Sequence, residues 1–239
     1  MKKFILLILI FTTFTSMADS LSLNKLIGQF DEKKDANFIS LDSTILPVNK
    51  SGMYLQKEVT QQLIKAYQDF KKVNPNIPFI IVSATRNYDY QNRIWQNKWN
   101  TIFAKLKNEQ KTAEEILKYS SMPGTSRHHW GTDVDITSVS NEYFKSNPQG
   151  KILYQWLQDN MPKYGFCQPF NNGRKGGYLP EEWHWSYHPI SKNYLAKYKD
   201  IFDKDSQLII NKLNFVGHNK IQLKEFIKEY VFDINSECY

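Results

Sequence analysis

The stretch Gly124-Thr-Ser-Arg-His-His-Trp-Gly-Thr-Asp-Val-Asp-Ile136 decides how the fold and the chemistry of this chain are interpreted. Polar and apolar residues alternate from Thr132 to Ser138, which predicts a half-buried strand with its acids on one face. Neutral imidazole nitrogens and carboxylate oxygens suit zinc. The stretch therefore predicts a strand beside a metal site, with two adjacent histidines and two alternating acids as candidates: His128, His129, Asp133 and Asp135.

A second cluster, Glu181-Glu182-Trp183-His184, adds another acid and another imidazole. Aromatic and polar residues alternate from Trp183 to Tyr187, which predicts a strand with His184 and Ser186 on one face. An acid that does not bind the metal can deprotonate metal-bound water, so two His, an Asp and a spare Glu are the components of a zinc hydrolase. Spacing alone leaves the ligand choice open, because three further residues are alternatives: Asp133, His129 and His188.

Elements around these two motifs are predicted from periodicity. Apolar residues recur every three or four positions over 55–73, which predicts an amphipathic helix that ends before Pro75. The apolar run Pro78–Val82 predicts a buried strand, and the helix that follows it places Arg86 at a strand-to-helix junction.

Three more segments are predicted farther along the chain. Thr112 followed by Glu115 resembles a capping box, which predicts a helix that starts there and runs through Tyr119. An apolar stripe predicts a helix from about Gln149 to Tyr164. Residues 171–177 are rich in Asn and Gly and predict a turn between two strands.

The first residues have the layout of a secretory signal peptide. Met1-Lys2-Lys3 precedes an apolar run from Phe4 to Phe14, and small residues follow at 16 and 18. The run is too short to span a bilayer. We expect a mature chain that begins near Asp19, has no stable membrane span and is secreted or periplasmic. The expected organisation is a signal peptide over 1–18, a lead-in over 19–50, a metal-binding domain over 51–190 and a helical extension over 191–239 that packs on the domain.

Composition and charge exclude several classes of protein. An apolar share of 41% and an aromatic share of 15% support a packed core and exclude global disorder. The net charge of +7 includes Lys2 and Lys3 of the expected signal peptide, so the mature chain carries 29 basic and 24 acidic residues, about +5. This modest excess fits attraction to an anionic surface such as a bacterial cell wall. Lysine pairs such as Lys71-Lys72 are isolated, so the sequence lacks the basic run that nucleic-acid binding requires.

Cys167 and Cys238 are the two cysteines of the chain. In an oxidising compartment such a pair can form one disulfide, which would tie the C-terminal tail to the metal-binding domain. Two free thiols are the alternative, because two cysteines carry no spacing pattern.

Taken together, the motifs resemble a known family. Ser126-x-His128-x-x-Gly131-x-x-x-Asp135 and the later Glu181-x-Trp183-His184 are similar to motifs of the zinc D-alanyl-D-alanine carboxypeptidases of the VanY type, and Ser83-x-x-Arg86 with Gln91 resembles the upstream motif of that family. The resemblance covers roughly residues 56–187. It implies an α+β fold in which a small antiparallel sheet, flanked by helices, holds the metal, as in hedgehog domains and lysostaphin-like peptidases.

Carried over position by position, the resemblance implies a role for each candidate. His128, Asp135 and His184 would be the zinc ligands, and Glu181 the catalytic base. Arg86 would bind the substrate or the developing oxyanion. Gln91 and Ser126 would add hydrogen bonds to the substrate.

The chain also departs from the family pattern. Asp133 stands where relatives usually have Ala, and His128-His129-Trp130 replaces the commoner His-Gln-Thr. These changes lie beside the metal and leave the ligand positions filled, so they bear on substrate preference.

The resemblance implies a zinc peptidase that acts on D-amino-acid-containing stem peptides of peptidoglycan, first as a D,D-carboxypeptidase. An endopeptidase or dipeptidase on the same scaffold is the alternative among enzymes. A non-catalytic zinc-binding module is the competing class.

Overall fold

The computed structural model describes residues 21–239, so the predicted signal peptide lies outside the described residues. The strands are β1 (Phe38–Ser40), β2 (Tyr54–Gln56), β3 (Ile81–Ser83), β4 (Asp133–Ile136), β5 (Phe166–Cys167) and β6 (His184–Tyr187). The α-helices are α1 (Leu23–Leu26), α2 (Lys57–Val73), α3 (Tyr88–Leu106), α4 (Glu109–Leu117), α5 (Asn141–Ser146), α6 (Pro148–Asn160), α7 (His188–Asp205), α8 (Gln207–Ile210) and α9 (Leu223–Phe232). Three 3-10 turns complete the set: η1 (Arg127–Trp130), η2 (Met161–Tyr164) and η3 (Ser236–Cys238).

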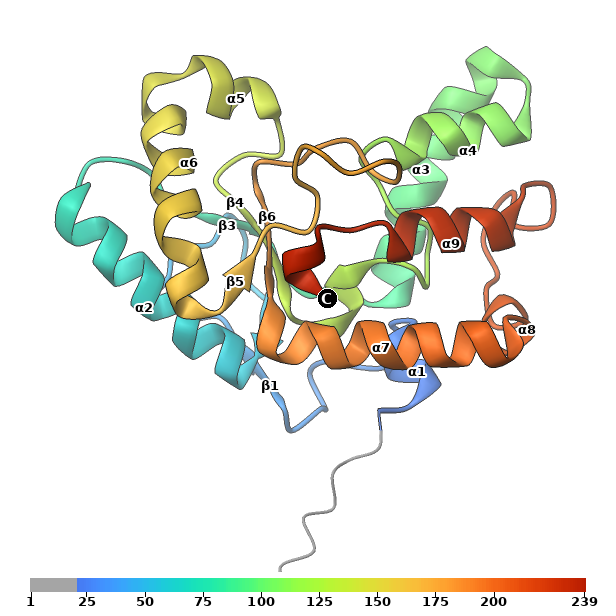
Figure 1. Cartoon of the computed structure of the whole chain (residues 1–239), viewed down its shortest axis with the longest axis horizontal. Helices are drawn as coiled ribbons and strands as arrows, with labels where there is room; N and C mark the ends of the chain where they lie inside the picture. Colours follow the sequence, from blue (N-terminus) through green and yellow to red (C-terminus); the bar gives the residue numbers. More distant parts are fainter. Residues whose placement is uncertain (1–20) are drawn as a thin grey trace, which may run out of the picture.

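A four-stranded antiparallel sheet with the order β3-β4-β6-β5 lies at the centre of the molecule (Figure 1). Helices surround it, which confirms the predicted α+β class. The smaller sheet pairs β1 with β2.

One face of the central sheet packs against α2 and α6. Val134 and Ile136 of β4 share a hydrophobic core with Phe70 of α2 and Leu157 of α6. Figure 1 shows these two helices together on one side of the sheet. The amphipathic helix predicted over 55–73 is confirmed as α2, two residues shorter at its start.

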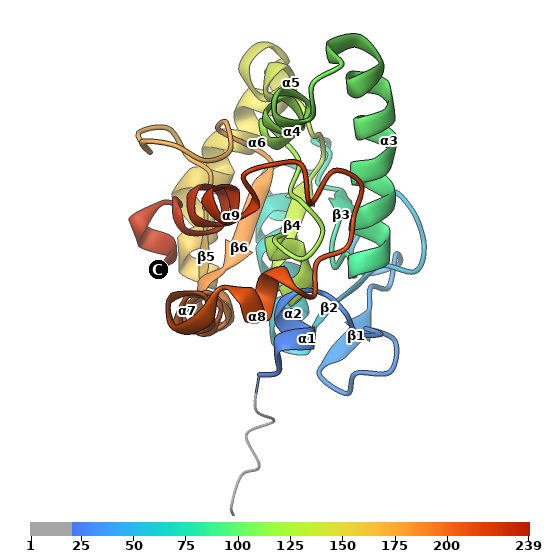
Figure 2. The same cartoon turned by 90° about the vertical axis from the view of Figure 1, so that its right-hand side faces the viewer.

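A second hydrophobic core lies among α3, α4, α7 and α9. Trp95 and Trp99 of α3 pack there with Leu195 and Tyr198 of α7 and with Phe226 of α9. Figure 2 looks onto β4 and β6 between α9 on one side and α3 on the other. Because α7 starts at His188, the residues after 190 continue this helix, and they share the second hydrophobic core with α3.

Two predicted helix boundaries are wrong. Helix α4 begins at Glu109, where Asn108 caps it by accepting a hydrogen bond from the N–H of Lys111, and the Thr112 hydroxyl donates back to the carbonyl of Asn108. Asn is a stronger N-cap than Thr, so the upstream residue prevails. The helix predicted to reach Tyr164 ends at Asn160 and continues as η2, where Pro162 cannot supply a helical N–H.

The segment 171–177 lies between β5 and β6, which pair antiparallel, as predicted. The connection is long, running from Gln168 to Trp183, so these residues form part of an extended loop and do not make a tight hairpin.

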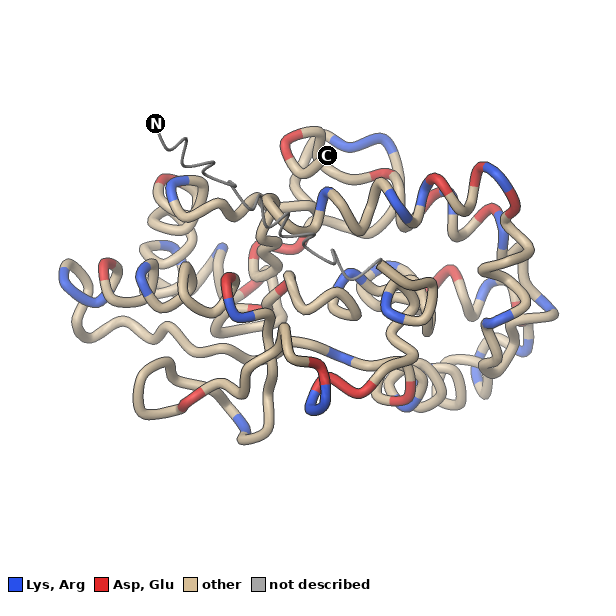
Figure 3. Tube along the Cα trace, turned by 90° about the horizontal axis from the view of Figure 1, so that it is seen from below, with Lys and Arg blue, Asp and Glu red and all other residues tan. Residues whose placement is uncertain are grey.

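No helix within residues 21–239 is long and apolar enough to cross a membrane. Basic and acidic residues are interspersed along the outer helices (Figure 3).

Candidate active site

Two neighbouring strands present acids and a histidine to the same side of the sheet. In the antiparallel pairing of β4 with β6, Asp135 lies opposite His184 and Asp133 lies opposite Ser186. Trp185, which alternates with them, packs in the core on the other face, as the two-residue period of a strand requires. The structure therefore confirms the strand faces predicted from alternation.

His128 comes from η1, directly before β4. Gly131 ends this turn with a φ of 66°, in the left-handed region that favours glycine, and a Cβ at this position would lie 2.2 Å from the ring of Phe38. The tight reversal brings the ring of His128 to a centroid distance of 4.8 Å from that of His184.

The two histidines and Asp135 form a compact set of potential ligands. Nε2 of His128 and Nδ1 of His184 each lie 3.4 Å from Oδ1 of Asp135. Zinc bonds of about 2.0–2.1 Å in a tetrahedral arrangement place neighbouring ligand atoms about 3.3–3.4 Å apart. All three side chains are buried, and their ligand atoms lie within 4.8 Å of one another. This donor set and its spacing fit zinc.

Two of these atoms also need a partner. Within the described residues, neither Nε2 of His128 nor Oδ1 of Asp135 makes a hydrogen bond, although both atoms are buried. Burying such atoms unsatisfied costs free energy, and a metal ion would remove that cost. The carbonyl of Ala84 accepts from Nδ1 of His128 at 2.8 Å, so Nε2 is the nitrogen that His128 presents.

The charges in the site suit a cation. Burial raises the pKa of Asp135, but the neighbouring His128, His184 and Arg86 outweigh burial, and the pKa is lowered overall. Burial lowers the pKa of His128. Burial also lowers the pKa of His184, but its hydrogen bonds with Asp133 and Glu181 outweigh this effect and raise the pKa to about 9. At neutral pH Asp135 is thus an anion and His128 is neutral, whereas His184 carries a proton that a metal ion would have to displace.

Glu181 lies beside the ligand set. Its Oε2 is 3.3 Å from Nδ1 of His184. Its backbone N–H donates to the carbonyl of Phe170, and its carbonyl accepts from the amide of Gln168, both at 2.8 Å. Burial raises the pKa of Glu181, and His184 offsets part of the shift. A carboxyl group with a raised pKa exchanges protons more readily near neutral pH, which a general base requires.

Arg86 approaches the same space from the loop after β3. Its N–H donates to the carbonyl of His128 at 3.1 Å, and its carbonyl accepts from Nδ1 of His129 at 2.5 Å. Nε of Arg86 is buried without a partner in the part of the chain that the structure describes. The backbone bonds fix the position of Arg86 relative to His128 and leave its guanidinium available for an anion.

These side chains enclose a cavity of about 20 Å³. A cavity needs roughly 10–15 Å³ to hold one water molecule, so this space holds a water but not the end of a peptide. The cavity is lined by Arg86, Tyr119, Ser120, Ser121, Arg127, His128, Phe170, Tyr178, Glu181 and His184.

Gln91 and Ser126, the two predicted sources of neutral hydrogen bonds to a substrate, are both buried and do not line this cavity. The amide nitrogen of Gln91 donates to the carbonyl of Ser121 at 2.7 Å, so Gln91 holds a residue of the cavity wall. Oγ of Ser126 makes no hydrogen bond to any residue of 21–239. Their roles toward a substrate stay predictions.

The three alternative ligands have other surroundings. Nδ1 of His129 donates to the carbonyl of Arg86, and its Nε2 accepts from the N–H of Gly124. His188 is the first residue of α7 and lines a separate cavity of about 610 Å³ together with Trp185. The prediction that His188 continues the strand face of His184 is wrong, because the strand ends at Tyr187.

Asp133, the third alternative, contacts one of the candidate ligands but is not itself one of them. Asp135 is the acid of the ligand set. Its Oδ2 lies 2.9 Å from Nε2 of His184 and 3.0 Å from Nε of Arg127. Burial raises the pKa of Asp133, but Arg127 and His184 outweigh burial and lower it overall. Arg127 was not among the residues predicted to form the site. This motif has one acid more than the same motif in relatives, and a basic residue lies inside it. That combination could have indicated an ion pair.

Cys167 and Cys238 form a disulfide, with a Cα–Cα distance of 5.7 Å. The tail before Cys238 is held as well: Asn235 donates its N–H to the carbonyl of Pro169 at 2.9 Å and its amide to the carbonyl of Gln168 at 3.1 Å. Because Gln168 donates a hydrogen bond to the backbone of Glu181, the C-terminal tail, through Gln168, helps to fix the position of this candidate base.

The chain is similar to a known protein family over more than half of its length. Residues 52–190 match the family described as VanY, D-alanyl-D-alanine carboxypeptidase. The chain belongs to this family. The matched residues include every candidate site residue.

Two VanY-family relatives show how far the likeness extends. YodJ of Bacillus subtilis is 36% identical over 141 residues, covering 56% of this chain and 46% of YodJ. A D-alanyl-D-alanine carboxypeptidase of Enterococcus faecalis is 28% identical over 110 residues, covering 45% of this chain and 39% of that protein. The matched regions amount to less than half of either relative.

Two solved structures share the VanY-like fold. VanYB in complex with D-alanine-D-alanine superposes with a TM-score of 0.50 at 19% identity, over 74% of this chain and 93% of VanYB. The LD-carboxypeptidase LdcB superposes with a TM-score of 0.52 at 23% identity, over 85% of this chain and 81% of LdcB.

Proposed function

We propose that this chain is a zinc-dependent D,D-carboxypeptidase that removes the terminal D-alanine from stem peptides of peptidoglycan. The observation that carries the proposal is the buried set of His128, Asp135 and His184 with Glu181 beside it, in a member of the VanY family. Zinc held by three such ligands keeps a fourth position for water and lowers the pKa of that water to about 7.

Glu181 is the residue placed to move protons. Its carboxylate would take a proton from water as the water attacks the peptide carbonyl and would return that proton to the leaving amine. Its position 3.3 Å from Nδ1 of His184 places it next to the ligand set. The presence of this acid favours an enzyme over a non-catalytic zinc-binding module.

Arg86 supports cleavage at a chain end. A guanidinium group pairs well with a carboxylate and, equally, with a developing oxyanion. The unpartnered Nε of Arg86 is buried within the described structure, and the residue lines the small closed cavity. A half-buried cation with an unpartnered nitrogen beside the candidate ligands suits a substrate with a free terminal carboxylate, which favours carboxypeptidase over endopeptidase activity.

The bond that is cleaved distinguishes the alternatives. VanYB was solved with D-alanine-D-alanine, whereas LdcB is an LD-carboxypeptidase, and both share this fold. The test is to incubate the purified chain with pentapeptide-ending and tetrapeptide-ending muropeptides and to identify the products by mass. Loss of one alanine from the pentapeptide alone supports D,D-carboxypeptidase activity. Loss from the tetrapeptide indicates L,D activity, loss of a dipeptide indicates a dipeptidase, and an internal cut indicates an endopeptidase.

Metal dependence is tested in the same assay. Cleavage should stop with a chelator and return when zinc is added. Cleavage that a chelator leaves unchanged would contradict the proposal, as would the absence of cleavage in the zinc-supplemented protein.

The proposed substrate lies outside the cytoplasm, so we propose that the chain is exported with its N-terminal signal removed. The layout of residues 1–18 supports this proposal. Mass measurement of the protein recovered from culture medium or periplasm should give a chain that begins near Asp19. A full-length chain retained in the cytoplasm would contradict it.

A further inference from the structure

We infer that Asp133 and Arg127 form a buried pair that positions His184 for metal binding. This inference rests on the proposed metal site and concerns residues that do not themselves bind the metal. Asp133 fixes the orientation of the His184 ring, and Arg127 fixes the position of Asp133.

The carboxylate of Asp133 is fully occupied. Oδ1 accepts from the hydroxyls of Thr132 and Ser186 at 2.6 and 2.9 Å. Oδ2 accepts from Nε of Arg127 at 3.0 Å and lies 2.9 Å from Nε2 of His184. An ionised carboxylate offers about four acceptor positions, and all four are used here. The side chain is completely buried, so water cannot replace any of these donors.

This arrangement decides which nitrogen of His184 faces the metal. A carboxylate that accepts from Arg127 and two hydroxyls can only accept from the imidazole as well, so Nε2 of His184 is the donor. A neutral ring with its proton on Nε2 carries its lone pair on Nδ1, and Nδ1 is the atom that lies 3.4 Å from Asp135. Carboxylate partners of metal-binding histidines fix the tautomer and the ring orientation in this way.

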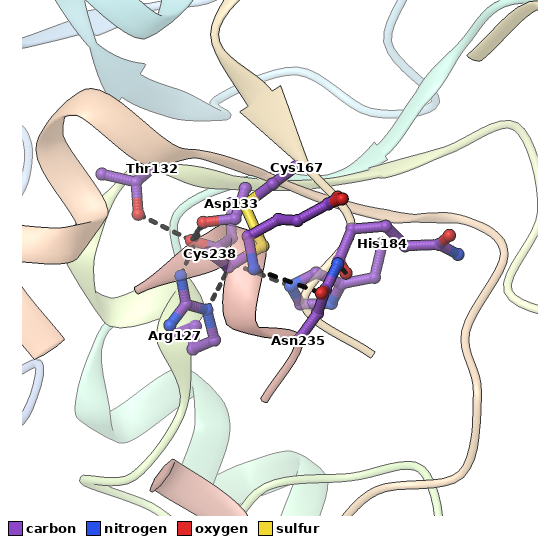
Figure 4. The surroundings of a disulfide bond; sticks show 10 residues. Arg127, Thr132, Asp133, Cys167, His184, Asn235 and Cys238 are labelled. Carbon is purple, nitrogen blue, oxygen red and sulfur yellow. Dashed lines mark hydrogen bonds and ion pairs between the residues drawn. A yellow bond between two sulfur atoms is a disulfide. The ribbon is translucent and has the colours of Figure 1, made fainter. Parts of the chain in front are cut away.

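Arg127 holds the carboxylate in place. Its Nη2 donates to Oγ of Ser186 at 2.7 Å, so Arg127 contacts Asp133 directly and also through Ser186. Its guanidinium lies 4.7 Å from the ring centre of Trp130, in the same turn η1. The pair thus connects η1, which carries His128, to β4 and β6, which carry Asp135 and His184. Figure 4 shows Arg127, Thr132 and His184 converging on Asp133, next to the disulfide.

The two histidine ligands are held by different means. Nδ1 of His128 donates a hydrogen bond to the backbone carbonyl of Ala84, and a side-chain substitution does not remove a backbone carbonyl. His184 depends on the side chain of Asp133. Loss of Asp133 should therefore loosen one ligand and leave the other in place, which predicts weaker metal binding and not its abolition.

The test compares zinc dissociation constants, measured by competition with a chromophoric chelator, for the wild-type chain and for variants of the pair. Asp133→Asn keeps the size of the side chain and removes its charge. The double variant Arg127→Met with Asp133→Ala removes both charges, so that no unpaired charge remains buried. Asp35→Asn is the matched control, because Asp35 also forms an ion pair, with Lys25 at 2.9 Å, away from the site.

We expect the Asp133→Asn and double variants to bind zinc about 10- to 100-fold more weakly than the wild type and the control to bind normally. Thermal unfolding without zinc should show the double variant folded. A folded double variant with wild-type zinc affinity would overturn the inference, since the pair would then serve only packing.

A second measurement does not depend on the variants folding. In the zinc-loaded wild-type chain, NMR should detect a slowly exchanging proton on Nε2 of His184, and a rapidly exchanging one would equally overturn the inference. The proposed function fails separately: a chain that binds zinc but leaves muropeptides uncut contradicts the function and leaves these affinity results standing.

Discussion

Breaking the disulfide between Cys167 and Cys238 should lower the stability of the chain by about 4 kcal/mol. The two residues are 71 positions apart. Closing a loop of that length in the unfolded chain removes about 15 cal/mol/K of conformational entropy, which corresponds to about 4.4 kcal/mol at 25 °C.

Urea unfolding, followed by far-UV circular dichroism with and without reductant, measures the effect. For a slope of about 2–3 kcal/mol/M, reduction should lower the midpoint by roughly 1.5–2 M. The Cys167→Ala/Cys238→Ala double variant should behave like the reduced chain and should not respond to reductant.

A shift below about 0.5 M would refute the entropic argument. It would mean that hydrogen bonds of the tail, such as those of Asn235 with Gln168 and Pro169, persist in the reduced unfolded ensemble or that the tail contributes little to the folded state.

Three further predictions concern the site. Glu181→Gln should bind zinc with unchanged affinity and lower kcat by about 10²–10⁴-fold, because it removes proton transfer and not a ligand; a variant with near-normal kcat would exclude Glu181 as the base. Arg86→Met should impair cleavage of substrates with a free terminal carboxylate far more than of the same peptides amidated at the terminus; equal loss on both would assign Arg86 to the oxyanion. Burial lowers the pKa of His129 to about 3. Below about pH 6.5, His129 therefore binds a proton in the unfolded chain but stays neutral in the folded chain. Stability without metal is therefore full above that pH and falls as pH drops toward 3. The fall between pH 7 and pH 5 is about 2 kcal/mol from this group, and His129→Gln should flatten it in chelator-containing urea titrations; parallel pH profiles would contradict the assignment.

The centre of the site could be predicted from the sequence because the alternation of polar and apolar residues follows directly from the geometry of a strand. A two-residue alternation fixes which side chains share a face of one strand, so Asp133 could be placed with Asp135, and His184 with Ser186, from the sequence pattern alone. Only the family resemblance brought the two strands together at one site. The pairing of β4 with β6, and hence the register that sets Asp135 opposite His184, depends on distant segments.

Features that depend on competition or on distance could not be predicted. The start of α4 was misplaced because Asn108 and Thr112 are both acceptable caps, and only the folded helix shows that Asn108 prevails. The partner of Asp133 was missed because Arg127 lies in a 3-10 turn, where no periodic pattern indicates which way a side chain points.

The position of the C-terminal tail decides when the surroundings of Glu181 are completed. Glu181 takes its support from Gln168, and Gln168 and Pro169 accept from Asn235, close to the end of the chain. At roughly 5–20 residues per second, a ribosome needs roughly 4–14 s to travel the 71 positions from Cys167 to Cys238. Until Asn235 is present, the loop behind Glu181 lacks the segment that closes it. Glu181 therefore acquires its final surroundings only after Asn235 has been added to the chain.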